Sequence, residues 1–139
     1  MKLSADEAGA RLASHDHGVL STVHARRGVD AVPVVYAFDD GYVGVPVDLV
    51  KAKASPRLQR VRNLEADPRA ALLVEHWDRQ DWSGLWWVRA QLRWQGDDPG
   101  GRADLLAGRL ARAFPQYRGQ PFANVLVLRV LAVTGWAAA

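Results

Sequence analysis

The chain has 139 residues, a net charge of +3 at neutral pH and no cysteine. This length suits one domain with a hydrophobic core of its own, and the missing cysteine excludes disulfides, cysteine-based zinc sites and thiol catalysis. The N-terminal residues include acids where a signal peptide needs an apolar stretch, and no apolar run approaches the roughly 20 residues of a membrane span. We therefore expect a cytoplasmic protein without a membrane partner.

The first part of the chain is predicted to form a short helix followed by a hairpin. Ser4 and Glu7 have the spacing of a capping box, in which the two residues satisfy backbone N–H groups at a helix start. The apolar pattern of this helix continues to about Ser14. Alternating and β-branched residues over 18–25 and 31–38, with a turn between them, predict two antiparallel strands.

A third strand and a second helix follow the hairpin. The strand is expected over 42–47, and Pro33 and Pro46 indicate edge or bulge positions, because proline has no N–H to donate to a ladder. Ser55 followed by a proline predicts a helix start, and apolar residues at helical spacing continue this helix to Asp67.

The second half of the chain is predicted to be mostly strand. The expected elements are strands over 69–77 and 85–95, a helix over 102–114 and a last strand over 124–134. Six mostly antiparallel strands with a few short helices predict a mainly β fold, a closed or partly closed barrel rather than a doubly wound sheet. We expect a single domain over residues 1–139.

The basic residues are concentrated between the third strand and the helix that follows it. From Asp48 to Asn63 one acid faces five basic residues, which are Lys51, Lys53, Arg57, Arg60 and Arg62. Helix N-termini offer unpaired N–H groups to phosphate, and lysine and arginine add charge-assisted hydrogen bonds. The segment therefore predicts an anion site, and a solvated helix face is the alternative.

Tryptophan is concentrated around the second hairpin. Alternation along the second strand of this hairpin puts Trp86, Val88, Ala90, Leu92 and Trp94 on one face, and Trp87, Arg89, Gln91 and Arg93 on the other. Because aromatic residues and arginine are enriched in the cores of interfaces, we predict a subunit contact on this barrel. The alternative is a core on one face and solvated arginines on the other.

No group of side chains indicates a catalytic constellation or a metal site, so the catalytic residues are unknown. The histidines are scattered, and His15 and His17 have a spacing that does not put both rings on one helix face. Ser21 and Thr22 have no nearby base and no nucleophile-elbow glycine pattern. A reaction would therefore have to be carried by a bound cofactor.

Several short motifs, read together, resemble one known family. They are Gly18 to Thr22, Val32 to Val34, Val47 with Asp48, Lys51 with Lys53, Leu58 to Asn63, Asp67 to Arg69, Leu72 to Val74, Asp81 with Trp82, Leu85 to Arg89, and Thr134 to Trp136. They resemble the pyridoxamine-phosphate-oxidase-like split-barrel superfamily, in particular its actinobacterial branch of coenzyme F-420-dependent (deazaflavin) oxidoreductases. The resemblance covers nearly the whole chain and implies an antiparallel split β-barrel of the FMN-binding type.

The resemblance also implies a homodimer whose cofactor lies between the subunits. Carried over by position, the residues at the phosphate end are Lys51, Lys53, Arg57, Arg60 and Asn63, and those beside the ring are Ser21, Thr22, Pro33 and Val34. Two positions depart from the family pattern. Residues 29–31 carry no Pro-His pair, and Leu92 and Trp94 replace small residues, which is expected to narrow the cavity.

The expected function is hydride transfer between reduced F-420 and a small organic substrate, with FMN as the alternative cofactor. F-420 carries a phosphodiester and a polyglutamate tail, so its longer anionic part suits the five basic residues better than one terminal phosphate does. Two other classes remain open, namely cofactor binding without turnover and nucleic-acid binding. The basic segment lacks interleaved aromatic residues, so we expect no nucleic-acid partner.

Overall fold

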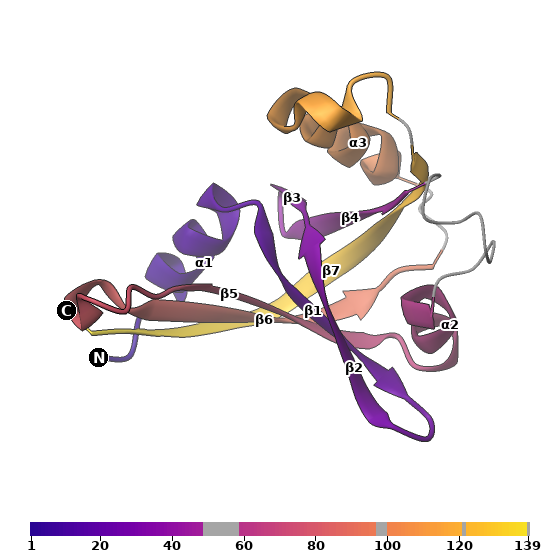
Figure 1. Ribbon diagram of the computed structural model, residues 1–139. Helices are drawn as coiled ribbons and strands as arrows, with labels where there is room; N and C mark the ends of the chain where they lie inside the picture. The colour runs from indigo at the N-terminus through magenta and orange to yellow at the C-terminus, as the bar shows by residue number, and fades with distance from the viewer. Residues whose placement is uncertain (49–58, 97–99, 121, 139) are drawn as a thin grey trace.

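The computed structural model describes residues 1–48, 59–96, 100–120 and 122–138. Its α-helices are α1 (Ala5–Ser14), α2 (Gln59–Ala66) and α3 (Arg102–Ala113). Its strands are β1 (His17–His24), β2 (Gly28–Val35), β3 (Ala37–Asp39), β4 (Tyr42–Asp48), β5 (Arg69–His76), β6 (Trp86–Trp94) and β7 (Phe122–Ala137). Two short 3-10 helices, η2 (Trp82–Gly84) and η3 (Pro115–Tyr117), are also present (Figure 1). None of the described helices is both long and apolar enough to cross a membrane.

The described strands pair antiparallel in one sheet of seven strands, in the order β2-β1-β5-β6-β7-β4-β3. β2 and β3 lie at opposite ends of this order, yet only Tyr36 separates them in the chain. The two ends of the sheet must therefore come close together, and the sheet curls into a half-barrel (Figure 1). This confirms the prediction of a mainly β, antiparallel split barrel.

The prediction of six strands is wrong, because the run over 31–38 breaks at Tyr36 into β2 and β3. The backbone N–H of Tyr36 donates to the carbonyl oxygen of Asp16 at 2.9 Å. The ring of Tyr36 is buried, and its hydroxyl donates to the carbonyl oxygen of Leu12 at 2.6 Å. Both bonds reach the end of α1 and the residues just after it, so the first helix holds the corner between the two strands.

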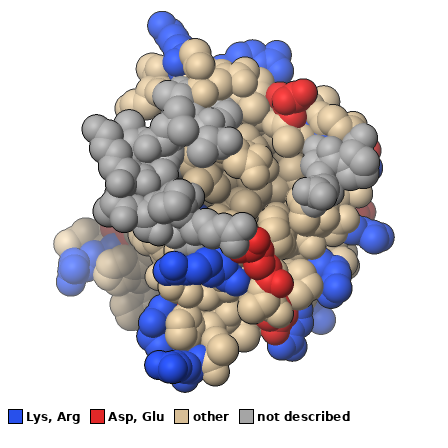
Figure 2. All heavy atoms as spheres, turned by 90° about the vertical axis from the view of Figure 1, so that its right-hand side faces the viewer, with Lys and Arg blue, Asp and Glu red and all other residues tan. Residues whose placement is uncertain are grey.

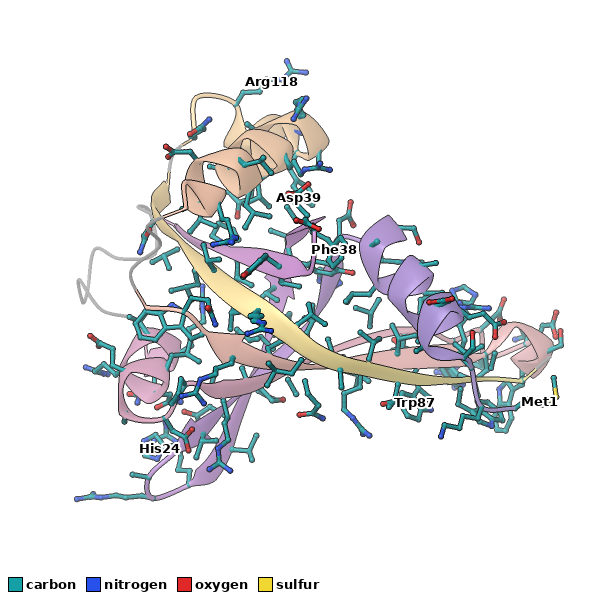
Figure 3. The ribbon with its side chains drawn as sticks, turned by 180° about the vertical axis from the view of Figure 1, so that it is seen from behind. Met1, His24, Phe38, Asp39, Trp87 and Arg118 are labelled. Atoms are coloured by element: carbon teal, nitrogen blue, oxygen red, sulfur yellow. The ribbon has the colours of Figure 1, made fainter. Side chains whose placement is uncertain are left out.

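The core fills the inside of the curled sheet. Its fully buried side chains include Leu20, Leu72, Leu92, Leu126, Leu128, Val43 and Val45. α1 adds Ala8 and Leu12 to this core. α3 lies against the outside of the sheet over β3, β4 and β7, where Leu106 and Leu110 form a second buried cluster with strand residues. No described helix packs on the outer face of β5 and β6, and Trp87 points from that face on the side opposite α1 (Figure 3).

The local signals at the first helix and at the two prolines are confirmed. The Ser4 hydroxyl accepts from the Glu7 N–H at 3.1 Å, and the Glu7 carboxylate accepts from the Ser4 N–H at 3.0 Å. Pro33 lies on the edge strand β2, and Pro46 lies in β4 just before a register shift at the end of that strand. The helix start predicted at Ser55 lies outside the described residues.

The last strand is longer than the prediction of 124–134. β7 runs over Phe122–Ala137 because its first half pairs with β4 and its second half continues along β6. The register with β6 shifts between Gln91 and Leu92, so Leu131 is an extra residue on β7 at a bulge. A sequence pattern does not reveal this length, because each half is stabilised by a different partner.

Replacing Tyr36 by Phe removes the hydrogen bond to Leu12 and keeps the buried ring. The Leu12 carbonyl would lose a buried donor, so we expect the free energy of unfolding to fall by about 1–3 kcal/mol. Urea denaturation followed by circular dichroism measures the change. Tyr42→Phe, at a partly exposed tyrosine, is the control, and an equal loss in both variants would contradict the role given to the Tyr36 hydroxyl.

Candidate functional site

A groove runs along the seam where the two ends of the curled sheet meet. It is lined by His17, Val32, Pro33, Val34, Val35, Val45, Pro46, Arg60 and Tyr117. Its volume is about 350 Å³, and small-molecule sites typically enclose about 300–1,000 Å³. This seam groove therefore has the size of a ligand site and draws its walls from β2, β4, α2 and η3.

The seam stays open because its two edges are poorly suited to pair with each other. Pro33 in β2 and Pro46 in β4 both lack the N–H that a ladder needs. β3 pairs only with Tyr42–Gly44 of β4, so in the described part of the chain the rest of β4 has no strand on that side. The result is a gap between two edges with valine and proline walls.

Arg60 brings a positive charge into this largely apolar groove. Its Nη2 atom lies 3.4 Å from the carbonyl oxygen of Pro46, and its Nε atom is buried. No acidic side chain is among the described residues that line the groove. A guanidinium that is partly removed from water interacts strongly with anions, because solvent screens it less than at an open surface. The groove is therefore suited to a carboxylate or phosphate.

The nine residues predicted to contact a cofactor fall into three groups. Arg60, Pro33 and Val34 meet in the seam groove. Lys51, Lys53 and Arg57 lie outside the described residues. Ser21, Thr22 and Asn63 do not line the seam groove. Figure 2 views the end of the molecule that carries α2, and basic side chains gather along the lower part of this face.

Asn63 and Thr22 belong to a polar network that holds α2 against the first hairpin. Asn63 is 4% exposed, and its amide nitrogen donates to the Thr22 hydroxyl at 3.0 Å and to an Asp30 carboxylate oxygen at 2.9 Å. Its amide oxygen accepts from the Gln59 amide at 2.8 Å. With both donors and the acceptor in use, Asn63 fixes the orientation of α2 and so the place of Arg60 on it.

Asp30 carries the negative charge of this network. The Arg27 guanidinium donates to both carboxylate oxygens of Asp30 at 2.9 Å. These bonds, and then the bond from Asn63, lower the pKa of Asp30 to about 2. The carboxylate therefore stays ionised at neutral and mildly acidic pH, and the network keeps its geometry there.

Ser21 faces the other side of the sheet. Its neighbours Leu20 and Thr22 are buried, whereas Ser21 is partly exposed on the outer face. A hollow of about 270 Å³ lies on that face, lined by Ser21, Thr22, Val23, Val29, Arg69, Ala70, Ala71 and Gln91. The structure thus separates Ser21 from Pro33 and Val34, which line the seam groove, although all three were predicted to lie beside one ring. We refer to this second depression as the outer hollow.

The alternation predicted for β6 is confirmed. Val88, Ala90 and Leu92 are buried, whereas Arg89, Gln91 and Arg93 are exposed on the outer face. Leu92 belongs to the core and Trp94 packs against it. Neither residue lines the seam groove or the outer hollow, so the narrowing expected from their size does not occur in these two depressions.

Asp30 and Gln59 also belong to the network around Asn63, and the sequence pattern did not predict their part in it. Asp30 stood out only as a departure from a family pattern, and its partners lie 33 residues away on α2 or across the turn. The hairpin register gives the missing signal, because pairing His24 with Gly28 places Thr22 directly opposite Asp30. Two polar residues opposite each other on the core-facing side of a sheet indicate a polar partner nearby, because buried polar groups are hydrogen-bonded.

Comparison with known proteins supports the fold. No family model and no curated protein matches the sequence. A structure described as an FAD-binding protein from Mesorhizobium loti has a TM-score of 0.73 at 19% identity, covering 97% of this chain and 93% of the other. An FMN-binding protein from Syntrophomonas wolfei has a TM-score of 0.67 at 17% identity, covering 96% and 86%.

A heme-binding protein from Mycobacterium smegmatis has a TM-score of 0.74 at 23% identity, covering 95% of this chain. This chain spans 53% of that protein, so about half of the heme-binding protein has no counterpart here. At identities this low, the structural similarity establishes the common fold, the split barrel. It does not show that the proteins bind the same ligands.

Acid should remove the contribution of Asp30 to stability. The pKa of Asp30 is about 2 in the folded protein and 3.8 as its ordinary value, so this contribution is complete above the ordinary value and is lost as pH falls through the folded value. We expect Asp30→Asn to be less stable than the wild type at neutral pH, and the difference to vanish between about pH 4 and pH 2.

Urea denaturation over a pH series measures this difference. Glu75→Gln removes an exposed carboxyl of β5 and is the matched control. A difference between wild type and Asp30→Asn that persists at the acid end would show that the carboxylate charge is not what stabilises the network.

Proposed function

We propose that the seam groove binds the phosphate end of a flavin-type cofactor, coenzyme F-420 before FMN, and that the protein is an oxidoreductase acting on a small organic substrate. The observation that carries this proposal is the partly buried Arg60 in a groove with valine and proline walls. FAD-binding and FMN-binding proteins with the same fold support the choice of cofactor class.

The described residues fit an anionic, partly apolar cofactor. Arg60 supplies a charge and a planar set of donors that match phosphate oxygens. Val32, Val34 and Val45 supply apolar surface next to it. We include Lys51 and Lys53 in the proposed phosphate site on the strength of the sequence, because they precede α2 in the same basic segment. F-420 is preferred because a phosphodiester followed by carboxylates needs several cations.

In this proposal the protein contributes position and electrostatics, and the bound cofactor supplies hydride chemistry. Arg60 binds and orients the phosphate. Asn63 acts through α2, because its three hydrogen bonds hold the helix that carries Arg60. Pro33 and Val34 keep one wall of the groove apolar and exclude water from it. A water or a hydroxyl on the substrate side would supply the proton that accompanies hydride transfer.

We further propose that two copies associate through the outer face of β5, β6 and β7. Leu73 and Trp136 are 39% and 37% exposed on this face, and Trp87 lies between them across the strands. Arg89 stacks over the Trp87 ring at 5.2 Å. Exposed aromatic side chains next to arginine are typical of interface cores. The partner would then cover an apolar area that a monomer leaves in water.

Titration with F-420 and, separately, with FMN tests the cofactor proposal. We expect micromolar or tighter binding of F-420, followed by cofactor fluorescence or tryptophan quenching. Arg60→Gln should weaken this binding by about tenfold to a hundredfold, which is the range for losing a charged hydrogen bond. The combined variant Lys51→Ala/Lys53→Ala should also weaken it.

Arg118→Gln is the matched control, because it removes the same charge from an exposed position outside the groove. Equal weakening in Arg60→Gln and Arg118→Gln would point to general charge and not to the groove. Binding of FMN alone would assign the flavin instead of the deazaflavin. Binding of neither cofactor would show that the oxidoreductase proposal is wrong.

Light scattering during size-exclusion chromatography tests the association of two copies. We expect the wild type to have twice the mass of the 15.3 kDa chain. Leu73→Arg places a charge within the proposed contact and should shift the mass to that of one chain. Leu105→Arg, at an exposed leucine of α3, should leave the mass unchanged. A single-chain mass for the wild type would rule out the proposed contact.

A further inference from the structure

Three arginines stand side by side across the outer face of the sheet. Arg69 of β5 is the direct cross-strand partner of Arg93 of β6, and Arg93 is the direct partner of Arg129 of β7. All three are exposed. Neighbouring strands lie about 4.8 Å apart, so the row spans about 10 Å. We refer to these three residues as the arginine row.

The described residues around the arginine row do not neutralise it. Arg69 forms an ion pair with Asp67 at 2.7 Å, and the pKa of Asp67 is lowered to about 2 by Arg69 first and also by the charge of Arg93. One carboxylate thus serves two arginines. For Arg93 and Arg129 the described part of the chain provides no ion pair of their own. Like charges directly opposite each other on a sheet are destabilising.

Polar and charged side chains lie beyond the arginine row on both sides. Beyond Arg129 the next strand carries Tyr42 as its cross-strand partner, and the Arg102 guanidinium stacks over the Tyr42 ring at 4.1 Å. On the other side Arg69 also lines the outer hollow, where Ser21 and Gln91 offer a hydroxyl and an amide beside apolar residues. The positive charge therefore borders a shallow, mixed polar and apolar depression.

We propose that the arginine row is an anion-binding site for a small molecule with two adjacent anionic groups and an apolar body that lies in the outer hollow. Arginine presents a planar fork of donors that binds phosphate or carboxylate oxygens in pairs. Two adjacent anionic groups match neighbouring arginines at strand spacing. The excess positive charge, which destabilises the free protein, is then offset when the ligand binds.

The short length of the row favours a small molecule over a nucleic acid. Tight non-specific binding to duplexes uses about six to ten phosphate contacts, whereas three arginines on neighbouring strands make the row. Apolar residues flank it along the strands, with Leu131 at the bulge of β7 and Leu73 on β5. A polyanion that followed the strands away from the row would meet these apolar side chains first.

This site does not depend on the cofactor proposed for the seam groove. The arginine row lies on the outer face, whereas Arg60 lies at the seam between β2 and β4. It also lies at the opposite end of the strands from Trp87 and Trp136, which are cross-strand partners in the proposed contact between copies. The two proposals can therefore fail separately.

Thermal unfolding with added inorganic pyrophosphate tests the site. A ligand that binds only the folded state raises the melting temperature with its concentration. We expect pyrophosphate to raise the Tm of the wild type by several degrees relative to sodium chloride of equal ionic strength. Arg93→Gln/Arg129→Gln should lose this rise, and it should have a higher Tm than the wild type at low salt, because a like-charge pair is removed.

Two matched variants separate the site from general charge and from the seam groove. Arg112→Gln/Arg118→Gln removes the same two charges from α3 and the turn after it, and Arg60→Gln alters the groove. Arg112→Gln/Arg118→Gln should keep the full rise with pyrophosphate, and Arg60→Gln should keep the part of the rise that Arg93→Gln/Arg129→Gln loses. A rise lost equally in both double variants, lost only in Arg60→Gln, or absent from the wild type would overturn the proposal. Malonate in place of pyrophosphate distinguishes carboxylate from phosphoryl ligands by the larger rise.

Discussion

The whole structure depends on one constraint, which is that a single residue joins the two ends of the sheet. Tyr36 leaves β2 at one edge and enters β3 at the other, so the sheet has no freedom to lie flat. A buried hydroxyl bond and a backbone bond tie this residue to the end of α1 and its connection to β1. The curl, the enclosed core and the seam all follow from this corner. A longer connection would allow the edges to separate and the core to open.

The seam produced by this constraint contains the candidate ligand site. The groove lies between two edges that are held close together but do not pair fully. Proline on both edges hinders hydrogen bonding between them. α2 then places Arg60 in the groove, and the position of α2 is set by the buried amide of Asn63. Arg60, the proposed anion-binding residue, and Asn63, which positions α2, are therefore different residues. Substitutions at Asn63 and at Arg60 should have different effects on stability and binding.

The sequence predicts local features of this protein well and distant relationships poorly. The capping box at Ser4, the edge position of Pro33 and the two faces of β6 depend on residues a few positions apart, so periodicity and turn chemistry reveal them. The break at Tyr36 and the network around Asn63 depend on partners tens of residues away. The arginine row likewise exists only in the register of three strands, although each arginine is visible in the sequence.

The pairing of β7 has a consequence for the order of folding during synthesis. β7 joins β6 to β4, and no other described strand connects these two parts of the sheet by hydrogen bonds. Before this strand is made, β2, β1, β5 and β6 can pair only as one incomplete sheet, and β3 can pair only with β4. Both would expose unpaired edges and apolar faces to solvent or to chaperones. The complete sheet can therefore form only once the strand made last of the seven is available.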